Sequence, residues 1–240
     1  MLLLLLLTAC KDKLEIEHMN IKDFFTDPKV IELVNAVEQG NVDKIKALRK
    51  QGVDVNTVGT EGMTPLMWVL GKQSKQGMRI LLTLGANPNF VAPNGESVVT
   101  MAAGAEDSEL LKIVMEGGGN PNIKNYRGEP VLFTAIEQRR WLNLRLLLDS
   151  GADINAVDKA GETAMLRAAT LNQFEQVAYL IGRGADFTIP NIHGGTVALR
   201  VQERRLNPEL PNYQWQQKVR KMLEARGVKF PVPKPWEQNK

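Results

Sequence analysis

Five short segments of the chain are copies of one motif: GVDVN (52–56), GANPN (85–89), GGNPN (118–122), GADIN (151–155) and GADFT (184–188). The first glycines of successive copies recur at a constant interval, from position 52 to positions 85, 118, 151 and 184. A second series of glycines with the same spacing occurs at positions 62, 95, 128, 161 and 194. Two glycine series in phase indicate an internal repeat with a 33-residue period.

Each repeat contains the signals of two short helices. In the second repeat, Thr64 is positioned to cap the first helix, and Pro65 follows at the first helical position, where a missing N–H costs nothing. The second helix carries apolar residues at helical spacing, such as Ile80, Leu81 and Leu84. The motif glycine after it supplies the positive φ that ends a helix. Later copies of the opening are SVV (97–99), PVL (130–132), TAM (163–165) and TVA (196–198).

This period and the Thr-Pro-Leu opening resemble those of the ankyrin repeat family. The resemblance implies an all-α solenoid, in which 33-residue helix-turn-helix repeats are joined by β-hairpin-like loops. The family has a histidine after the Thr-Pro-Leu tripeptide that links neighbouring repeats by hydrogen bonds. The resemblance therefore implies mostly apolar contacts at the five corresponding positions here, which are Met67, Thr100, Phe133, Leu166 and Leu199.

The repeat pattern predicts the domain organisation. The repeat domain is expected over residues 28–230, with about six repeats, of which the first lacks the Thr-Pro opening and serves as a cap. The last repeat is ten residues longer, with an extra loop at 207–212 before a helix at 213–225. Residues 10–27 are rich in charge and are expected to form a tether. The proline-rich tail at 231–240 is expected to run extended.

The N-terminus predicts processing and lipidation. Six leucines at 2–7 are too few to span a bilayer, which takes roughly 20 apolar residues. A short apolar run that ends in small residues is typical of a secretory signal segment, here residues 1–9. The segment LTAC (7–10) resembles the lipobox of bacterial lipoproteins, which implies acylation at Cys10, and Lys11 implies the outer membrane. The alternative is a hydrophobic N-terminus with an incidental cysteine.

Several classes of function lack support in the sequence. The single cysteine excludes a disulfide within the chain, and the two histidines, His18 and His193, have no metal-binding spacing. No phosphate-binding glycine loop or nucleophile–base set is present, so no catalytic residue, metal or cofactor is expected. A net charge of +3 does not predict nucleic acid binding.

The expected activity is the binding of another protein. In ankyrin proteins the hairpin tips and the exposed face of the first helices line the binding side. Tyrosine, tryptophan and arginine dominate binding hot spots, because they offer large contact areas. The alternative for Trp68 is a core position, and the alternative for each charge is a solvated surface. The candidate partner-binding residues are Tyr126, Arg127, Arg139, Arg140, Trp68, Glu61, Met63, Asn94, Glu96 and Lys159.

A small ankyrin lipoprotein resembles the immunity proteins that are paired with type VI secretion lipase effectors. The resemblance implies a secreted toxin as the partner, a position on the periplasmic side of the bacterial outer membrane, and a chain that is monomeric when unbound. The alternative is a periplasmic ankyrin scaffold, similar to those linked to oxidative stress protection, or a protein of envelope organisation.

Overall fold

A computed structural model describes residues 19–125 and 127–235 of the chain. The described residues form twelve α-helices, two short 3-10 helices and two isolated β-bridges, which confirms the all-α prediction. Two of the predicted functional positions, Cys10 and Tyr126, lie outside the described residues. The chain divides into two compact units, the first made of Met1–Tyr126 with Arg140–Ala152 and the second of Arg127–Arg139 with Asp153–Lys240.

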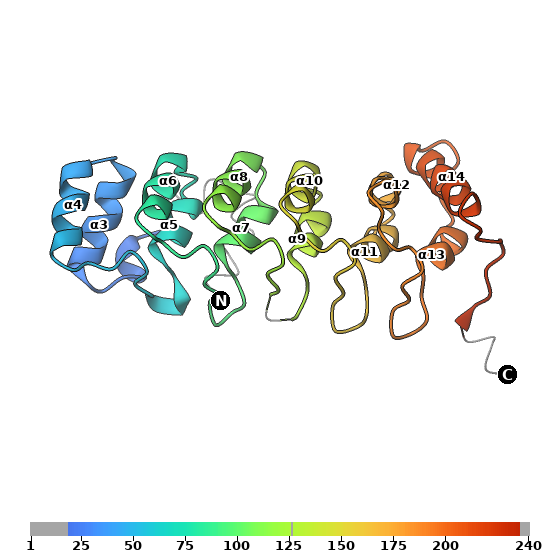
Figure 1. Ribbon diagram of the computed structural model, residues 1–240, viewed down its shortest axis with the longest axis horizontal. Helices are drawn as coiled ribbons and strands as arrows, with labels where there is room; N and C mark the ends of the chain where they lie inside the picture. Colours follow the sequence, from blue (N-terminus) through green and yellow to red (C-terminus); the bar gives the residue numbers. More distant parts are fainter. Residues whose placement is uncertain (1–18, 126, 236–240) are drawn as a thin grey trace. The chain divides into compact units, whose positions relative to one another are not determined.

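Among the residues that the structure describes, the first unit contains three complete helix pairs and one further helix, whose labels are given in Figure 1. Within it, α3 packs on α4, α5 on α6 and α7 on α8, while α10 packs against both α7 and α8. Neighbouring pairs contact each other through α3 and α5, α5 and α7, and α6 and α8. Its elements are η1 (Ile21–Asp23), α3 (Pro28–Glu38), α4 (Val42–Lys50), η2 (Thr60–Gly62), α5 (Pro65–Gly71), α6 (Lys75–Thr83), α7 (Val98–Gly104), α8 (Ser108–Glu116) and α10 (Trp141–Asp149).

The second unit contains one single helix and two complete pairs. In this unit α11 packs on α12 and α13 on α14, α11 also contacts α9 and α13, and α12 contacts α14. The elements are α9 (Val131–Glu137), α11 (Ala164–Thr170), α12 (Phe174–Gly182), α13 (Val197–Glu203) and α14 (Pro211–Glu224). The last helix begins two residues before the predicted start, because Pro211 is suited to the first turn of a helix.

Four first helices, α5, α7, α11 and α13, start with the predicted side-chain cap, whereas α9 follows Pro130 without one. The Thr64 hydroxyl oxygen accepts a hydrogen bond from the Met67 N–H at 3.2 Å, with Pro65 in the first turn. Ser97, Thr163 and Thr196 cap the corresponding helices in the same way. The residues in place of the family histidine are all buried, which confirms the prediction of mainly apolar contacts there, although the Thr100 hydroxyl also donates to Glu96.

The motif glycines end the second helices, as predicted. Gly52, Gly85, Gly118, Gly151 and Gly184 all have φ values between 84° and 91°. Residues with a Cβ rarely adopt this conformation, so glycine is the residue that turns the chain out of the helix at the lowest cost.

The asparagine at the end of the motif joins one hairpin to the next. Asn89 Oδ1 accepts a hydrogen bond from the Asn120 N–H at 2.6 Å, and Asn89 Nδ2 donates to the Gly118 carbonyl at 2.9 Å. Asn56 makes the same two contacts with the hairpin that follows it. In the second unit, Asn155 Oδ1 accepts from the Asp186 N–H at 2.9 Å. Each of these motif asparagines therefore satisfies backbone groups of the following repeat.

The segment before the first repeat packs against the first unit. Phe24 and Phe25 are buried, and the Thr60 N–H donates to the Phe24 carbonyl at 2.8 Å. A methyl group on Gly59 would collide with the Phe24 carbonyl oxygen, so a glycine is required for this close approach. The folded part of the chain therefore begins before residue 28, within the stretch that was expected to act as a tether.

The C-terminal tail takes the place of one more hairpin in the second unit. Gly128 faces Lys159 and Gly161 faces Asn191, each in the hairpin that follows. Gly194 faces Pro235 instead. These two residues are further apart in the sequence than the other pairs, as expected from the greater length of the last repeat. Gly227, with φ +93°, ends α14 as the motif glycines end the other second helices. The tail therefore covers the hairpin of the last repeat.

A side-chain amide on α13 fixes this tail. Gln202 Oε1 accepts a hydrogen bond from the Val232 N–H at 2.7 Å, and Gln202 Nε2 donates to the Val232 carbonyl at 3.2 Å. The Arg220 guanidinium lies 4.3 Å from the centre of the Phe230 ring. These contacts replace the asparagine bridge, because the last motif copy ends in Thr188, which hydrogen-bonds Asp186 in its own loop.

Among the residues that the structure describes, no helix is long and apolar enough to cross a membrane.

We expect Asn89→Ala to lower the free energy of unfolding by about 1–3 kcal/mol, because it removes two hydrogen bonds between hairpins. Thr188→Ala is the matched control at the same motif position, since its hydrogen bonds stay within its own loop. Urea denaturation followed by circular dichroism measures both variants. An equal loss in the two variants would contradict the bridging role of the asparagine.

We expect Gln202→Ala to release the tail and to lower the free energy of unfolding by about 1–3 kcal/mol, through loss of both hydrogen bonds to Val232. The readouts are thermal denaturation and the rate of limited proteolysis between residues 228 and 235. Gln214→Ala, which removes an exposed amide from α14, serves as the control. Unchanged proteolysis of the tail in Gln202→Ala would show that other contacts hold it.

Candidate functional site

The predicted binding residues of the first unit divide into exposed and buried positions. Glu61 lies in η2 and is exposed, with a φ of +57°. Asn94 is partly exposed in the next hairpin. Met63, Trp68 and Glu96 are buried, at 1%, 6% and 9% exposure. Glu61 and Asn94 thus have side-chain surface that a partner could contact, whereas Met63, Trp68 and Glu96 expose very little.

Trp68 is held on α5 by residues around it. Its indole Nε1 donates a hydrogen bond to Glu38 Oε1 at 2.9 Å. The Phe24 ring lies 5.7 Å away between centroids, and Lys72 Nζ lies 5.3 Å from the ring centre. This environment corresponds to the core alternative for Trp68, because burial of its ring and pairing of its N–H both stabilise the first unit.

Arg140 contributes to the packing of the first unit. Its Nε donates to the Gly104 carbonyl at 2.8 Å, and its guanidinium lies 3.1 Å from Glu106 Oε1. The Gly104 carbonyl belongs to the last turn of α7, where backbone acceptors have no partner within the helix. Only 18% of the Arg140 side chain is exposed.

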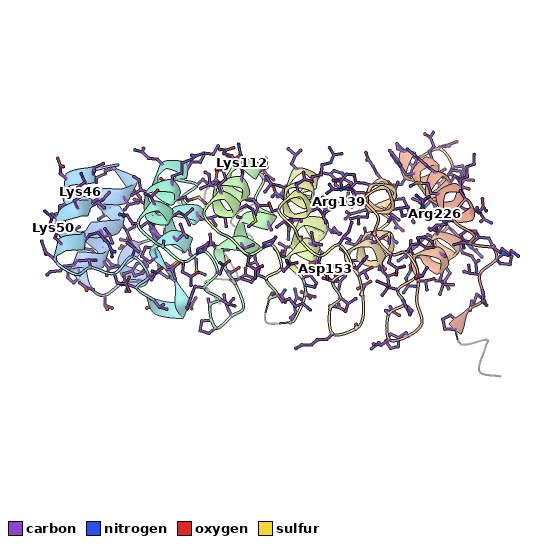
Figure 2. The ribbon with its side chains drawn as sticks, viewed as in Figure 1. Lys46, Lys50, Lys112, Arg139, Asp153 and Arg226 are labelled. Atoms are coloured by element: carbon purple, nitrogen blue, oxygen red, sulfur yellow. The ribbon has the colours of Figure 1, made fainter. Side chains whose placement is uncertain are left out.

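The second unit places three predicted cations on its surface. Arg127 is 56% exposed and forms an ion pair with Glu129 at 3.0 Å. Lys159 is exposed in the next hairpin, where its side chain covers Gly128. Arg139, labelled in Figure 2, is exposed and has a φ of +55°. Arg127 and Lys159 therefore lie on adjacent hairpins of this unit.

A charged cluster in the second unit was missed by the sequence reasoning. Arg167 on α11 is surrounded by four carboxylates, and these five residues form what we call the Arg167 cluster. The guanidinium lies 2.8 Å from Glu137, 2.8 Å from Glu162, 3.3 Å from Asp158 and 3.9 Å from Glu129. One face of the guanidinium lies over Phe133, 4.7 Å from the ring centre.

The Arg167 cluster is partly withdrawn from water. Asp158, Glu129 and Glu162 have side chains that are 9%, 13% and 16% exposed, while Glu137 is 32% exposed and thus only partly shielded from water. Burial raises the pKa of Glu137, and the carboxylates of Glu129 and Glu162 raise this pKa further. The positive charges of Arg167 and Arg127 act in the opposite direction, without cancelling the shift. The cluster thus holds excess negative charge at a site of reduced solvation.

The repeat register contains the signal that would have revealed this cluster. Arg167 lies at the repeat position that Trp68 occupies in the second repeat, three periods earlier. Glu96, Glu129 and Glu162 likewise occupy one repeat position in successive copies and stand just before the first helices. Aligned repeats therefore place an arginine beside a column of glutamates, a pattern that a search for aromatic hot spots overlooks.

The described residues contain no group of three or more histidine, cysteine, aspartate or glutamate side chains arranged to hold a metal ion. A hollow of about 330 Å³ lies between α6 and α8 in the first unit, lined by Arg79, Leu82, Thr83, Ile113, Glu116 and Gly117. The polar side chains of this lining are engaged elsewhere: Arg79 pairs with Glu109, Glu116 pairs with Lys112, and the Thr83 hydroxyl donates to the Arg79 carbonyl.

The comparisons with known proteins agree with the repeat architecture. The ankyrin repeats (3 copies) family model matches residues 33–125 and 99–191, which together make up more than half of the chain. Among curated proteins, none matches this sequence.

Three solved structures illustrate the similarity of fold. The ankyrin repeat domain of Bcl-3, a member of the IkappaB family, is 22% identical over 85% of this chain and 89% of its own, with a TM-score of 0.70. The ankyrin repeat protein EF0377 is 25% identical over 81% and 97%, with a TM-score of 0.64. An ankyrin repeat domain from Acinetobacter baumannii is 21% identical over 82% and 98%, with a TM-score of 0.67. With its regular glycine period, its paired helices and this match to the family model, the chain belongs to the ankyrin repeat family.

Proposed function

We propose that this ankyrin protein is a lipid-anchored inhibitor located at the bacterial envelope. Its target is a type VI secretion lipase or phospholipase effector, which it binds and neutralises. The observation that carries the proposal is the lipobox-like LTAC at residues 7–10 ahead of an ankyrin array. Ankyrin repeats bind other proteins, and an anchor would hold such a binding surface at the membrane where a phospholipase acts.

The binding part of the proposal is supported by how the hairpins are built. The hydrogen bonds of motif asparagines such as Asn89 join neighbouring hairpins, so this joining does not use the charged groups at the tips. Glu61, Arg127 and Lys159 are exposed at these tips. Tyr126 lies outside the described residues, and its role in binding stays a prediction.

The anchoring part of the proposal rests on Cys10, which also lies outside the described residues. Acyl chains on a cysteine and on the adjacent N-terminus give stable attachment, because each buried CH₂ contributes about 0.8 kcal/mol. The stretch from Cys10 to Met19 spans at most roughly 30 Å when fully extended. An acylated Cys10 would therefore keep the start of the first unit close to the lipid headgroups.

The second candidate is a periplasmic scaffold linked to oxidative stress protection or to envelope organisation. It shares the anchor and the protein-binding array, and differs in the partner. Affinity capture of the tethered protein from its native envelope, and the identity of neighbouring genes, separate the two. A lipase-type effector next to the gene supports inhibition, whereas a catalase supports the scaffold.

We expect Arg127→Ala with Lys159→Ala to weaken binding of the captured partner at least tenfold, a loss of about 1.4 kcal/mol or more. Both side chains are exposed on adjacent hairpins of the second unit, so the change should leave its core intact. Isothermal titration calorimetry measures the affinity. The control, Lys218→Ala with Lys221→Ala, removes the same charge from α14. Equal affinity of the two double variants would remove these hairpins from the binding surface.

We expect a strain that lacks the protein to be killed by siblings that deliver the effector, and the wild-type gene to restore survival. Cys10→Ala should restore survival less well, because the inhibitor would no longer be held at the membrane. Radiolabelled palmitate should mark the wild-type protein and leave Cys10→Ala unlabelled. Full survival of the deletion strain would refute the inhibitor function, whereas equal labelling of both proteins would refute only the anchor.

A further inference from the structure

The Arg167 cluster has an unusual balance of charge for a partly buried site. Four carboxylates, those of Glu129, Glu137, Asp158 and Glu162, surround the guanidinium of Arg167 at distances between 2.8 Å and 3.9 Å. A second cation, Arg127, pairs with Glu129 at 3.0 Å, and 56% of its side chain is exposed. The guanidinium of Arg167 is thus shared by four carboxylates, and the contribution of the exposed Arg127 is weakened by solvent screening.

The elements that carry these groups restrict how far the carboxylates can separate. Glu137 ends α9, and Arg167 lies on α11, which packs directly against α9. Asp158 accepts hydrogen bonds from the backbone N–H groups of Ala160 and Glu162. The Thr170 hydroxyl donates to Glu162 at 3.4 Å. The carboxylates are thus held in place by the fold as well as by Arg167.

We propose that the Arg167 cluster is a proton-responsive brace between α9 and α11, which takes up a proton in mildly acidic solution and thereby stabilises the second unit. Ordinary acid denaturation has the opposite sign, because carboxylates that are well paired in the native state lose their partners when they are protonated. Where several carboxylates share one guanidinium, protonation of one of them has the opposite effect on stability. It removes one negative charge and so relieves the repulsion among the remaining carboxylates.

Glu137 is the carboxylate that accepts the proton. The charged groups that face it are Arg167 from α11, Glu129 and Arg127 from the hairpin before α9, and Glu162 from the hairpin before α11. Burial, the largest cause, raises the pKa of Glu137, and the two neighbouring glutamates add to the rise. Its ion pair with Arg167, at 2.8 Å, does not offset these effects.

The raised pKa of Glu137 determines whether the fold gains or loses stability as the pH falls. A carboxyl group whose pKa is higher in the folded chain than in the unfolded chain binds its proton more tightly when folded. Stability from this group therefore rises as the pH falls through the folded pKa of Glu137, and the gain is complete below the ordinary glutamate pKa. At neutral pH the charged form of Glu137 makes the fold less stable than a neutral side chain would.

The test compares the full chain with Glu137→Gln, which mimics the protonated side chain at every pH. We expect Glu137→Gln to melt at a temperature at or above that of the wild type at pH 7. The difference in melting temperature should shrink toward zero as the pH is lowered to about 4.5, because the wild type then takes up its proton. Thermal denaturation between pH 4.5 and 7.5 measures both chains.

Glu203→Gln is the matched control. Glu203 occupies the same repeat position as Glu137 two periods later, and its ion pair in the structure is with Arg200 at 3.4 Å. The difference between the wild type and this control should not widen as the pH rises from 4.5 to 7.5.

Arg167→Met supplies a second and independent measurement. Methionine keeps an apolar stem over Phe133 and removes the cation, which leaves four carboxylates without their shared partner. We expect a loss of melting temperature at pH 7 that is largely recovered at pH 5, or, where the variant is unfolded at pH 7, refolding on acidification. A Glu137→Gln variant that is less stable than the wild type by the same margin at every pH would overturn the proposal. So would an Arg167→Met variant without recovery in acid.

Discussion

The hydrogen bonds from each motif asparagine to the backbone of the next hairpin are the constraint on which this architecture depends. A single helix pair cannot bury its apolar face alone, so each repeat is stable only against a neighbour. Asn56 and Asn89 hold that neighbour at one spacing, because each joins both an N–H and a carbonyl of the following loop. Equivalent positions then recur on the same side of each unit, and a column of residues one period apart becomes a physical surface.

Much of the fold could be predicted from local signals. Thr64 and Pro65 determine where a helix starts, and the motif glycines at 52 to 184 determine where one ends. These effects are local, so single residues are sufficient to predict the helix boundaries. The packing of the segment before the first repeat could not be predicted in this way. Phe24 and Phe25 stand in a charged stretch without periodicity, and their burial depends on a hairpin that comes a full repeat later in the chain.

The candidate site was harder to predict, for a related reason. Residue type suggests Trp68 and Arg140 as contact residues, yet Glu38 engages the indole and the end of α7 engages the guanidinium. These partners come from other repeats, and nothing in the local sequence marks them. The exposed positions Glu61, Arg127 and Lys159 follow more directly from the hairpin register, because the tip of a hairpin has little protein around it.

The ending of the array has a consequence for how proteins of this kind change length. Thr188 does not reach forward to another hairpin, and the proline-containing segment after α14 docks on Gln202 and Gly194 instead. The contacts of this tail with Gln202 and Gly194 are thus encoded after residue 184. Duplication or loss of a whole repeat module upstream would leave this terminus intact, so a lineage could lengthen or shorten its binding surface in single steps without inventing a new end.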